Sequence, residues 1–312
     1  MSAEVLAIDV GGTKLAAGLV DADGAVRAVE RTPTEAGADG ETLWSGLVGL
    51  VDRVMTAAGT PDIAGVGVGC GGPMRWPSGE VSPLNIRGWR DFPLRQRLGA
   101  RYPGVPVRLH NDAVAVAIAE HWLGAGKGTS HMLGMVVSTG VGGGLVLGGR
   151  LVNGTSGNAG HIGHVVVDPA GPACVCGGRG CLEAIARGPA LADWAHQQGW
   201  RPEGAGTGRD LTEDARAGDA IAVAALARGG EAVGLAVATV TALCDLDVVA
   251  IGGGVSQAGD MLFGPIQEAL DRHTGMAFTR NVRVVPAALG QESGLVGAAA
   301  LVHQGEKYWS AD

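Results

Sequence analysis

The sequence lacks the clusters of positive charge that nucleic-acid-binding proteins carry. Its 312 residues include 23 lysines and arginines against 31 aspartates and glutamates, so the net charge is −8, and no run of basic residues occurs. Binding a polyanion needs a concentrated basic surface, so this composition argues against nucleic acid as a partner. We therefore expect positively charged residues to act at single positions and not as an extended basic surface.

Signals for export and for membrane insertion are also missing. No basic segment followed by an apolar one opens the chain, because residues 5–10 already have the pattern of a buried strand. The most apolar helix candidate, residues 232–244, is too short to cross a bilayer and is interrupted by Thr239 and Thr241. We therefore expect a cytoplasmic protein with no membrane partner.

Cysteine is scarce and odd in number, with five in the chain, which agrees with a reducing compartment. Hydrophobic residues make up 46% of the sequence, enough to bury a large core, and the length predicts two lobes. The 55 glycines lie within apolar stretches. They indicate tight turns and close approach of the backbone to ligands.

Four residues have the type and spacing of metal ligands. Three cysteines form a Cys-x-Cys-x4-Cys cluster, and a histidine precedes them by nine intervening residues; the set is His164, Cys174, Cys176 and Cys181. Three thiolates and one imidazole suit tetrahedral Zn²⁺ and leave no open position, so the metal would be structural. Disulfides or scattered buried thiols are the alternative, although Cys-x-Cys spacing bridges poorly. A bound ion would fix the flanking residues His161 and Glu183.

Two glycine-rich turns repeat one design. Residues 6–24 and residues 133–154 each have two apolar strands joined by such a turn, which is a hairpin pattern. Backbone N–H groups in such bends can face phosphate oxygens, while hydroxyls and a lysine add donors and charge. A single glycine-rich hairpin is more often just a tight turn, and neither turn has P-loop or Rossmann spacing. The candidate phosphate-binding residues are Gly11, Gly12, Thr13, Lys14, Thr139, Gly140, Gly142 and Gly143.

Two further features point to a nucleotide. Asp9 ends the first strand, where its carboxylate could hold water around nucleotide-bound Mg²⁺. A buried strand in residues 248–256 ends in a glycine triplet whose Gly253 and Gly254 could admit adenine or its ribose. The sequence thus predicts ATP with Mg²⁺.

A predicted strand at residues 105–109 leads to Asn111 and Asp112, which an alanine-rich helix follows. Asn and Asp are favoured helix caps, and capping is one explanation of the pair. The other is chemical, because open α/β sheets collect ligands at the carboxyl ends of strands. There Asp112 could accept a proton from a hydroxyl that attacks phosphorus.

Together these features resemble the ROK family of sugar kinases and related repressors over nearly the whole chain. Residues 9–14 are similar to its first phosphate motif and residues 138–144 to its second. Residues 163–183, Gly-His-x9-Cys-x-Cys-Gly-x2-Gly-Cys-x-Glu, are similar to its zinc signature, which is highly specific. The resemblance implies an α/β fold of the actin-like, ribonuclease H-like type. Its two lobes would be residues 1–113 with 294–312, and residues 114–293.

The resemblance also implies roles. Asp112 would be the general base that helps transfer the γ-phosphoryl group of ATP to the 6-hydroxyl of a hexose or N-acetylhexosamine, with structural Zn²⁺ on the four ligands. The enzyme would be a homodimer or a higher homo-oligomer. The implied sugar-binding residues are Gly72, Asn85, Asn111, Asp112, His161 and Glu183.

One residue departs from the family pattern. Most hexokinases and glucokinases of the family carry glutamate where this chain has His161, so recognition of the sugar near C2 should differ. The strings AGHIGH and GCLEAIA are similar to those of bacterial N-acetylmannosamine kinases, and we expect N-acetylmannosamine as the substrate. The alternative is a packing substitution in a glucokinase. A non-catalytic sugar-sensing regulator is less expected, because family repressors carry a helix-turn-helix first and the first phosphate strand here begins at Val5.

Overall fold

The computed structural model describes residues 3–310 and divides into two compact units. The first unit consists of residues 1–128, 144–160 and 289–312, and the second of residues 129–143 and 161–288. The lobe boundaries expected from the family resemblance, after residue 113 and before residue 294, stay a prediction. The units defined by packing differ from them in assigning residues 114–128, 144–160 and 289–293 to the first unit.

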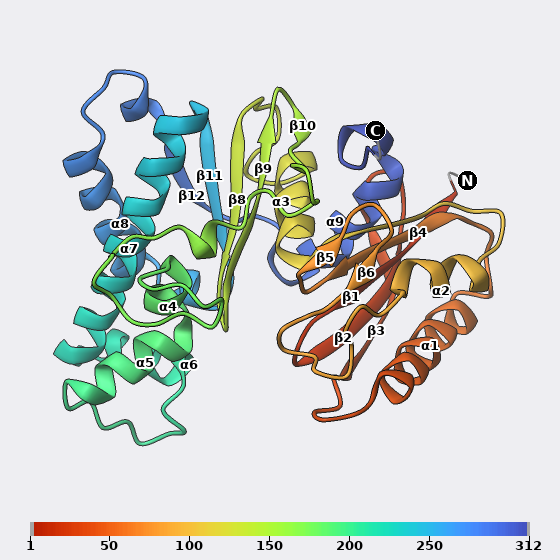
Figure 1. Cartoon of the computed structure of the whole chain (residues 1–312), viewed down its shortest axis with the longest axis horizontal. Helices are drawn as coiled ribbons and strands as arrows, with labels where there is room; N and C mark the ends of the chain where they lie inside the picture. Colours follow the sequence, from red (N-terminus) through yellow and green to blue (C-terminus); the bar gives the residue numbers. More distant parts are fainter. Residues whose placement is uncertain (1–2, 311–312) are drawn as a thin grey trace. The chain divides into compact units, whose positions relative to one another are not determined.

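The first unit contains a five-stranded sheet of order β3-β2-β1-β4-β7 (Figure 1). Its β1 pairs antiparallel with β2 and parallel with β4, and β4 pairs parallel with β7. Val10, Cys70 and Asn111 are therefore in register at the carboxyl ends of the three parallel strands. The strands are β1 (Glu4–Val10), β2 (Lys14–Val20), β3 (Val26–Pro33), β4 (Ile63–Cys70) and β7 (Val107–Asn111), with a small hairpin of β5 (Met74–Arg75) and β6 (Glu80–Val81).

Alternation along β1 assigns its side chains to two different cores. Leu6 and Ile8 belong to a cluster with the buried face of helix α1 (Gly40–Ala57), while Val5 and Ala7 belong to a cluster with Leu295 of helix α9 (Ser293–His303). Successive strand residues point to opposite faces, so Asp9 lies on the α9 side. A short helix, α2 (Leu94–Arg101), adds Leu94 and Leu98 to the α1 cluster.

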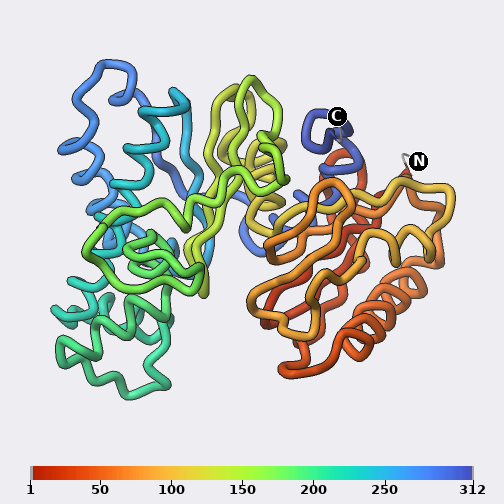
Figure 2. The backbone as a smooth tube through the Cα atoms, viewed as in Figure 1, coloured from red at the N-terminus to blue at the C-terminus, as the bar shows by residue number. Residues whose placement is uncertain are grey.

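The C-terminal helix α9 packs on the strands that begin the chain (Figure 2). A Cβ atom at Gly67 of β4 would lie 1.9 Å from the carbonyl oxygen of Ala298, and one at Gly297 would lie 1.7 Å from that of Ala115 in helix α3 (Asp112–Trp122). No side chain fits at either glycine. The two glycines thus permit α9 to lie directly against β4 and α3.

The second unit contains the parallel strands β8 (Met132–Val137), β11 (Val248–Gly252) and β12 (Arg283–Pro286). They belong to a sheet of order β10-β9-β8-β11-β12, in which β9 (Val141–Leu147) runs from the second unit into the first and is followed there by β10 (Arg150–Leu151). The helices of the second unit are α4 (Leu182–Ala186), α5 (Gly188–Gln197), α6 (Gly208–Arg216), α7 (Ala220–Cys244) and α8 (Asp260–His273).

Helix α7 corrects one expectation. It spans 25 residues, so it is long and apolar enough to cross a membrane by length and composition, contrary to the shorter helix expected from the sequence. Much of it is buried within the second unit instead. Cβ atoms at Gly230 and Gly234 would lie 2.6 Å from Leu262 O and from Ala269 Cβ of α8, respectively. Such close packing on another helix is that of a core helix in a soluble protein.

Most predicted elements are present with shifted ends. Apolar periodicity predicts a helix over residues 42–58. Helix α1 begins two residues earlier, because the Asp39 side chain accepts the Thr42 N–H over 2.7 Å and caps the helix. Strand β7 begins after Pro106 and runs on to Asn111, where residues 105–109 were expected. Proline has no N–H to donate to a sheet, so the strand starts at the next residue.

Candidate functional site

The first glycine turn joins β1 to β2 and is closed by its own hydrogen bonds. The N–H of Gly11 donates to the Lys14 carbonyl over 3.0 Å, and the Thr34 hydroxyl donates to the Gly11 carbonyl over 2.7 Å. Gly12, Thr13 and Lys14 are exposed. The turn has a defined shape, and its outer residues are accessible to a ligand.

Asp9 lies against the N-terminal turn of α9. A Cβ atom at Gly294 would be 2.7 Å from Asp9 Oδ2. Burial and the nearby Asp112 carboxylate raise the pKa of Asp9 to about 6, while Lys14 acts in the opposite direction. A bound cation favours the ionised form of a carboxyl group whose pKa is raised. Asp9 therefore fits the role of a Mg²⁺-associated oxygen donor.

Asn111 and Asp112 have separate roles in the structure. Asn111 is the N-cap of α3, because its Oδ1 accepts the N–H groups of Ala113 and Val114. Asp112 is the first helical residue, with Oδ1 2.8 Å from the Ala113 nitrogen and Oδ2 3.9 Å from a Cβ atom at Gly71. Burial raises the pKa of Asp112. The capping explanation therefore applies to Asn111, while the Asp112 carboxylate lies at the carboxyl end of the sheet.

Gly72 and Asn85 lie on two segments that contact each other. The Leu84 N–H donates to the Gly72 carbonyl over 3.2 Å, and a Cβ atom at Gly12 would lie 2.6 Å from Asn85 Cβ. The Asn85 side chain is exposed. At this edge the first unit thus brings together five of the predicted residues: Asp9, Gly12, Gly72, Asn85 and Asp112.

Sequence reasoning missed two polar residues that support these segments. His110 accepts the Asn111 N–H at Nδ1 over 2.8 Å, which places its proton on Nε2, 3.0 Å from Asn153 Oδ1. Arg90 donates to the Pro83 carbonyl over 2.9 Å, next to the Asn85 loop. The sequence signal for His110 was its position beside the Asn-Asp pair, and no sequence pattern indicated Arg90.

In the second unit, the four predicted metal ligands lie together. Their donor atoms are all within 4.8 Å of one another, with Cys176 Sγ 3.7 Å from Cys181 Sγ and Cys174 Sγ 3.8 Å from His164 Nδ1. Sulfur ligands of tetrahedral zinc, with bonds of about 2.3 Å, lie about 3.8 Å apart. The donor set and its spacing therefore fit a structural metal ion.

His161 lies beside this cluster, with its ring 6.3 Å from that of His164 and nearly parallel to it. Both ring nitrogens are buried and have no hydrogen-bond partner among residues 3–310. Burial and His164 lower the pKa of His161, and Glu183 raises it, so a neutral ring is favoured. A neutral imidazole offers one donor and one acceptor. Buried polar groups rarely stay unpaired, so these atoms are candidates for ligand contacts.

The second glycine bend is shorter than the sequence suggests. The Ser138 N–H donates to the Gly140 carbonyl over 2.8 Å, and Thr139 is exposed at the tip. Gly142 and Gly143, expected in the bend, are already in β9. The glycines of the bend are followed directly by the glycine and apolar residues of β9. The sequence pattern therefore did not indicate where the bend ends.

The third glycine segment packs beside this bend. Gly253 has a φ of +95°, and a Cβ atom there would lie 2.4 Å from the Val137 carbonyl oxygen. A Cβ atom at Gly254 would be 3.6 Å from Ser138 Oγ. Close packing explains the glycine at 253, and the adenosine contact of Gly253 and Gly254 stays a prediction.

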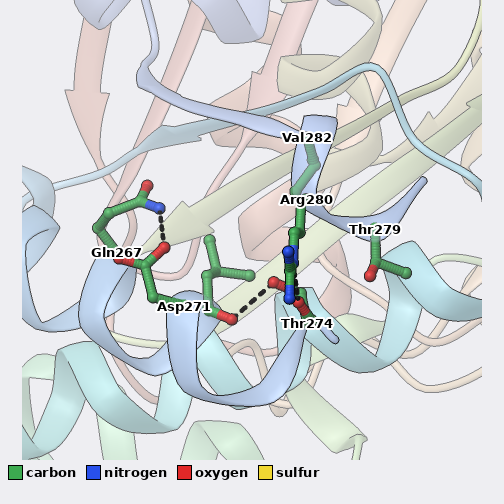
Figure 3. A pocket seen from close by; sticks show the side chains of 7 residues that line it. Gln267, Asp271, Thr274, Thr279, Arg280 and Val282 are labelled. Atoms are coloured by element: carbon green, nitrogen blue, oxygen red, sulfur yellow. Dashed lines mark hydrogen bonds between the residues drawn. The ribbon is translucent and has the colours of Figure 1, made fainter. Parts of the chain in front are cut away.

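A separate cavity of about 250 Å³ lies at the C-terminal end of α8 and contains none of the predicted residues (Figure 3). Its polar side chains are engaged with neighbouring groups. Gln267 donates to Asp271 over 2.8 Å, and Arg280 donates to the Thr274 carbonyl over 3.2 Å. This cavity is therefore not the candidate site.

Comparison with known proteins identifies the family of this chain. Residues 5–305 match the ROK family. The chain belongs to the ROK family. It is 39% identical to the N-acetylmannosamine kinase of Shigella flexneri over 97% of this chain and 99% of that protein. It is 33% identical to the glucokinase of Thermotoga maritima over 96% of this chain and 98% of that one.

The solved structure of another ROK protein has the same fold as this chain. The ROK glucokinase from Streptomyces griseus, in complex with glucose and AMPPNP, superposes with a TM-score of 0.84 at 32% identity, covering 97% of this chain and 100% of that one. These likenesses confirm the predicted family, the actin-like fold and the enzyme class, a ROK sugar kinase.

Proposed function

We propose that this ROK protein transfers the γ-phosphoryl group of ATP to the 6-hydroxyl of N-acetylmannosamine. The observation that carries the proposal is the Asp112 carboxylate, which lies at the carboxyl end of β7 beside Gly71 and close enough to Asp9 to raise its pKa. Parallel sheets collect substrates at this edge. Relatives named for N-acetylmannosamine and for glucose support a sugar as the acceptor.

In the proposed reaction Asp112 is the general base. The 6-oxygen forms its bond to the γ-phosphorus while the bond from that phosphorus to the β–γ bridging oxygen breaks, and ADP leaves with the bridging oxygen. The hydroxyl proton passes to Asp112. Burial raises the pKa of this carboxyl, which makes the ionised form a stronger base. The rate should therefore rise with pH as Asp112 ionises.

The glycine turns would position the nucleotide. Gly11, Gly12, Thr13 and Lys14 of the first unit are proposed to contact phosphate, as are Thr139, Gly140, Gly142 and Gly143 of the second, with Gly253 and Gly254 at the adenosine. Mg²⁺, when bound, would neutralise charge on the phosphates, with Asp9 as its associated carboxylate. Zn²⁺ on His164 and the three cysteines is proposed to have a structural role only.

The choice of sugar rests on His161. Its two buried ring nitrogens have no hydrogen-bond partner among residues 3–310 and can donate one hydrogen bond and accept another. The glutamate that the family pattern implies at this position can only accept. Such a ring suits a sugar whose C2 substituent offers hydrogen-bond donors and acceptors different from those of a hydroxyl group. The other proposed sugar ligands are Gly72, Asn85, Asn111 and Glu183.

We also propose a cytoplasmic location and a homodimeric assembly. Metal-bound thiolates persist in a reducing cytoplasm, which supports a cytoplasmic enzyme. A homodimer is proposed from the family resemblance alone. Light scattering of the purified protein would test it.

A substrate panel tests the function directly. We expect a coupled ADP-release assay to give a higher kcat/KM for N-acetylmannosamine than for glucose, N-acetylglucosamine or mannose. One pocket residue commonly changes selectivity by about 1–3 kcal/mol, or roughly 5- to 150-fold. Higher kcat/KM for glucose would make the enzyme a glucokinase and His161 a packing substitution. No phosphorylation of any sugar would leave a sugar-binding protein without catalysis and would overturn the proposal.

A further inference from the structure

Glu183 makes a contact that a role in sugar binding does not explain. Its Oε2 accepts the backbone N–H of Val141 over 2.9 Å, and a Cβ atom at Gly140 would lie 2.9 Å from the same oxygen. The carboxylate therefore lies directly against the peptide between Gly140 and Val141. Its other oxygen, Oε1, forms no hydrogen bond with the residues that the structure describes, and the residue as a whole is half-buried.

The same peptide segment is contacted from its carbonyl side. A Cβ atom at Gly163 would lie 2.1 Å from the Val141 carbonyl oxygen, so only glycine permits this approach. The N–H of Val141 is thus fixed by Glu183, and its carbonyl lies against the Gly163 backbone. Val141 is the first residue of β9 and directly follows the bend.

Both contacts come from residues next to metal ligands. Glu183 is two residues after Cys181 in the first turn of α4, and Gly163 immediately precedes His164. An ion that fixes Cys181 and His164 also constrains the neighbouring Glu183 and Gly163, which contact Val141 through a side chain and through the backbone, respectively. The metal cluster is therefore connected to the second glycine bend by two short chain segments.

We infer that Glu183 is a positioning residue for the nucleotide and couples the metal cluster to the second glycine bend. This inference rests on the proposed function, because it assumes that the bend contacts phosphate. Oε2 holds the bend in place before nucleotide arrives, and Oε1 remains for the sugar. A bend that is already ordered loses less conformational freedom when phosphate binds, so affinity is higher.

Two uncharged variants separate this role from simple charge effects. Glu183→Gln retains an oxygen that can accept the Val141 N–H, whereas Glu183→Ala does not. In the absence of sugar, we expect Mg²⁺–AMPPNP to bind Glu183→Ala about fivefold more weakly than Glu183→Gln, the order expected for one lost hydrogen bond. Glu203→Ala, which removes an exposed carboxylate elsewhere in the second unit, should bind nucleotide like the wild type.

Hydrogen exchange gives a readout that needs no catalysis. Amides of residues 138–147 should exchange faster in Glu183→Ala than in Glu183→Gln, and faster in chelator-treated wild type than in metal-loaded protein. Circular dichroism and metal analysis would establish that both variants are folded and loaded.

The outcomes are distinguishable. Equal nucleotide affinity and equal exchange in the two Glu183 variants would overturn the inference, while sugar phosphorylation by the wild type would leave the proposed function intact. Faster exchange in the alanine variant but not in the chelator-treated wild type would show that Glu183 orders the bend without the metal, and it would overturn the coupling to the metal cluster. A wild-type protein that binds no nucleotide would overturn the proposed function and this inference with it.

Discussion

Replacing Asp9 by asparagine should make the folded protein more stable at neutral pH while it reduces phosphoryl transfer. The structure raises the pKa of Asp9 from 3.8 to about 6, mainly through burial and then through Asp112. One pKa unit corresponds to about 1.4 kcal/mol, so ionised Asp9 destabilises the folded state by roughly 3 kcal/mol, or about 1–2 kcal/mol after allowance for its partial exposure.

The sign of the pH dependence follows from the direction of the shift. Because the pKa is higher in the folded state, that state binds the proton more tightly, and stability falls as pH rises from about 4 to about 6. The destabilisation is complete above this window and absent below it. Asp9→Asn has no charge to ionise, so its gain in stability should be present at about pH 7.5 and should largely disappear near pH 4.

Urea unfolding followed by tryptophan fluorescence at several pH values would measure this difference. Asp23→Asn is a suitable control, because Asp23 lies exposed in the turn after β2. Its stability should follow that of the wild type at every pH. An Asp9→Asn protein that is no more stable than the wild type at neutral pH would refute the reasoning, whatever its activity.

Three further substitutions test the proposed general base and two buried structural contacts. Asp112→Asn should lower kcat by ~10²–10⁴ with an unchanged circular dichroism spectrum, and unchanged turnover would remove its role as general base. Gly253→Ala should lower the free energy of unfolding by about 1–3 kcal/mol, because φ is +95° and the Val137 carbonyl occupies the space for Cβ; wild-type stability in urea would contradict this. Tyr308→Phe should cost about 1–3 kcal/mol in thermal unfolding, since the buried His121 Nδ1 lies 2.6 Å from the lost hydroxyl; an unchanged Tm would show that this bond contributes nothing.

Local patterns in the sequence were sufficient for several parts of the protein. The metal ligands lie within 18 residues of one another, and their spacing alone predicted the cluster that the structure shows. The apolar run in residues 5–10 predicted strand β1, and the apolar periodicity of residues 42–58 predicted helix α1, apart from their ends. These features depend on neighbours a few residues apart, which a sequence displays directly.

Other parts depended on contacts that no local pattern displays. Glu183 and Val141 are 42 residues apart, and His121 and Tyr308 are 187 apart. The Asn-Asp pair had two explanations, and only the start of α3 at Asp112 assigned the cap to Asn111.

The sequence by itself therefore determined which chemical groups are available: a Cys3His set, two glycine turns and a carboxylate after a strand. The tertiary structure decided which of them act on one another, because strand order brings Val10, Cys70 and Asn111 to one edge and because α9 returns to place Gly294 against Asp9. Burial at that edge then set the pKa of Asp9, a property that depends on surroundings and not on residue type.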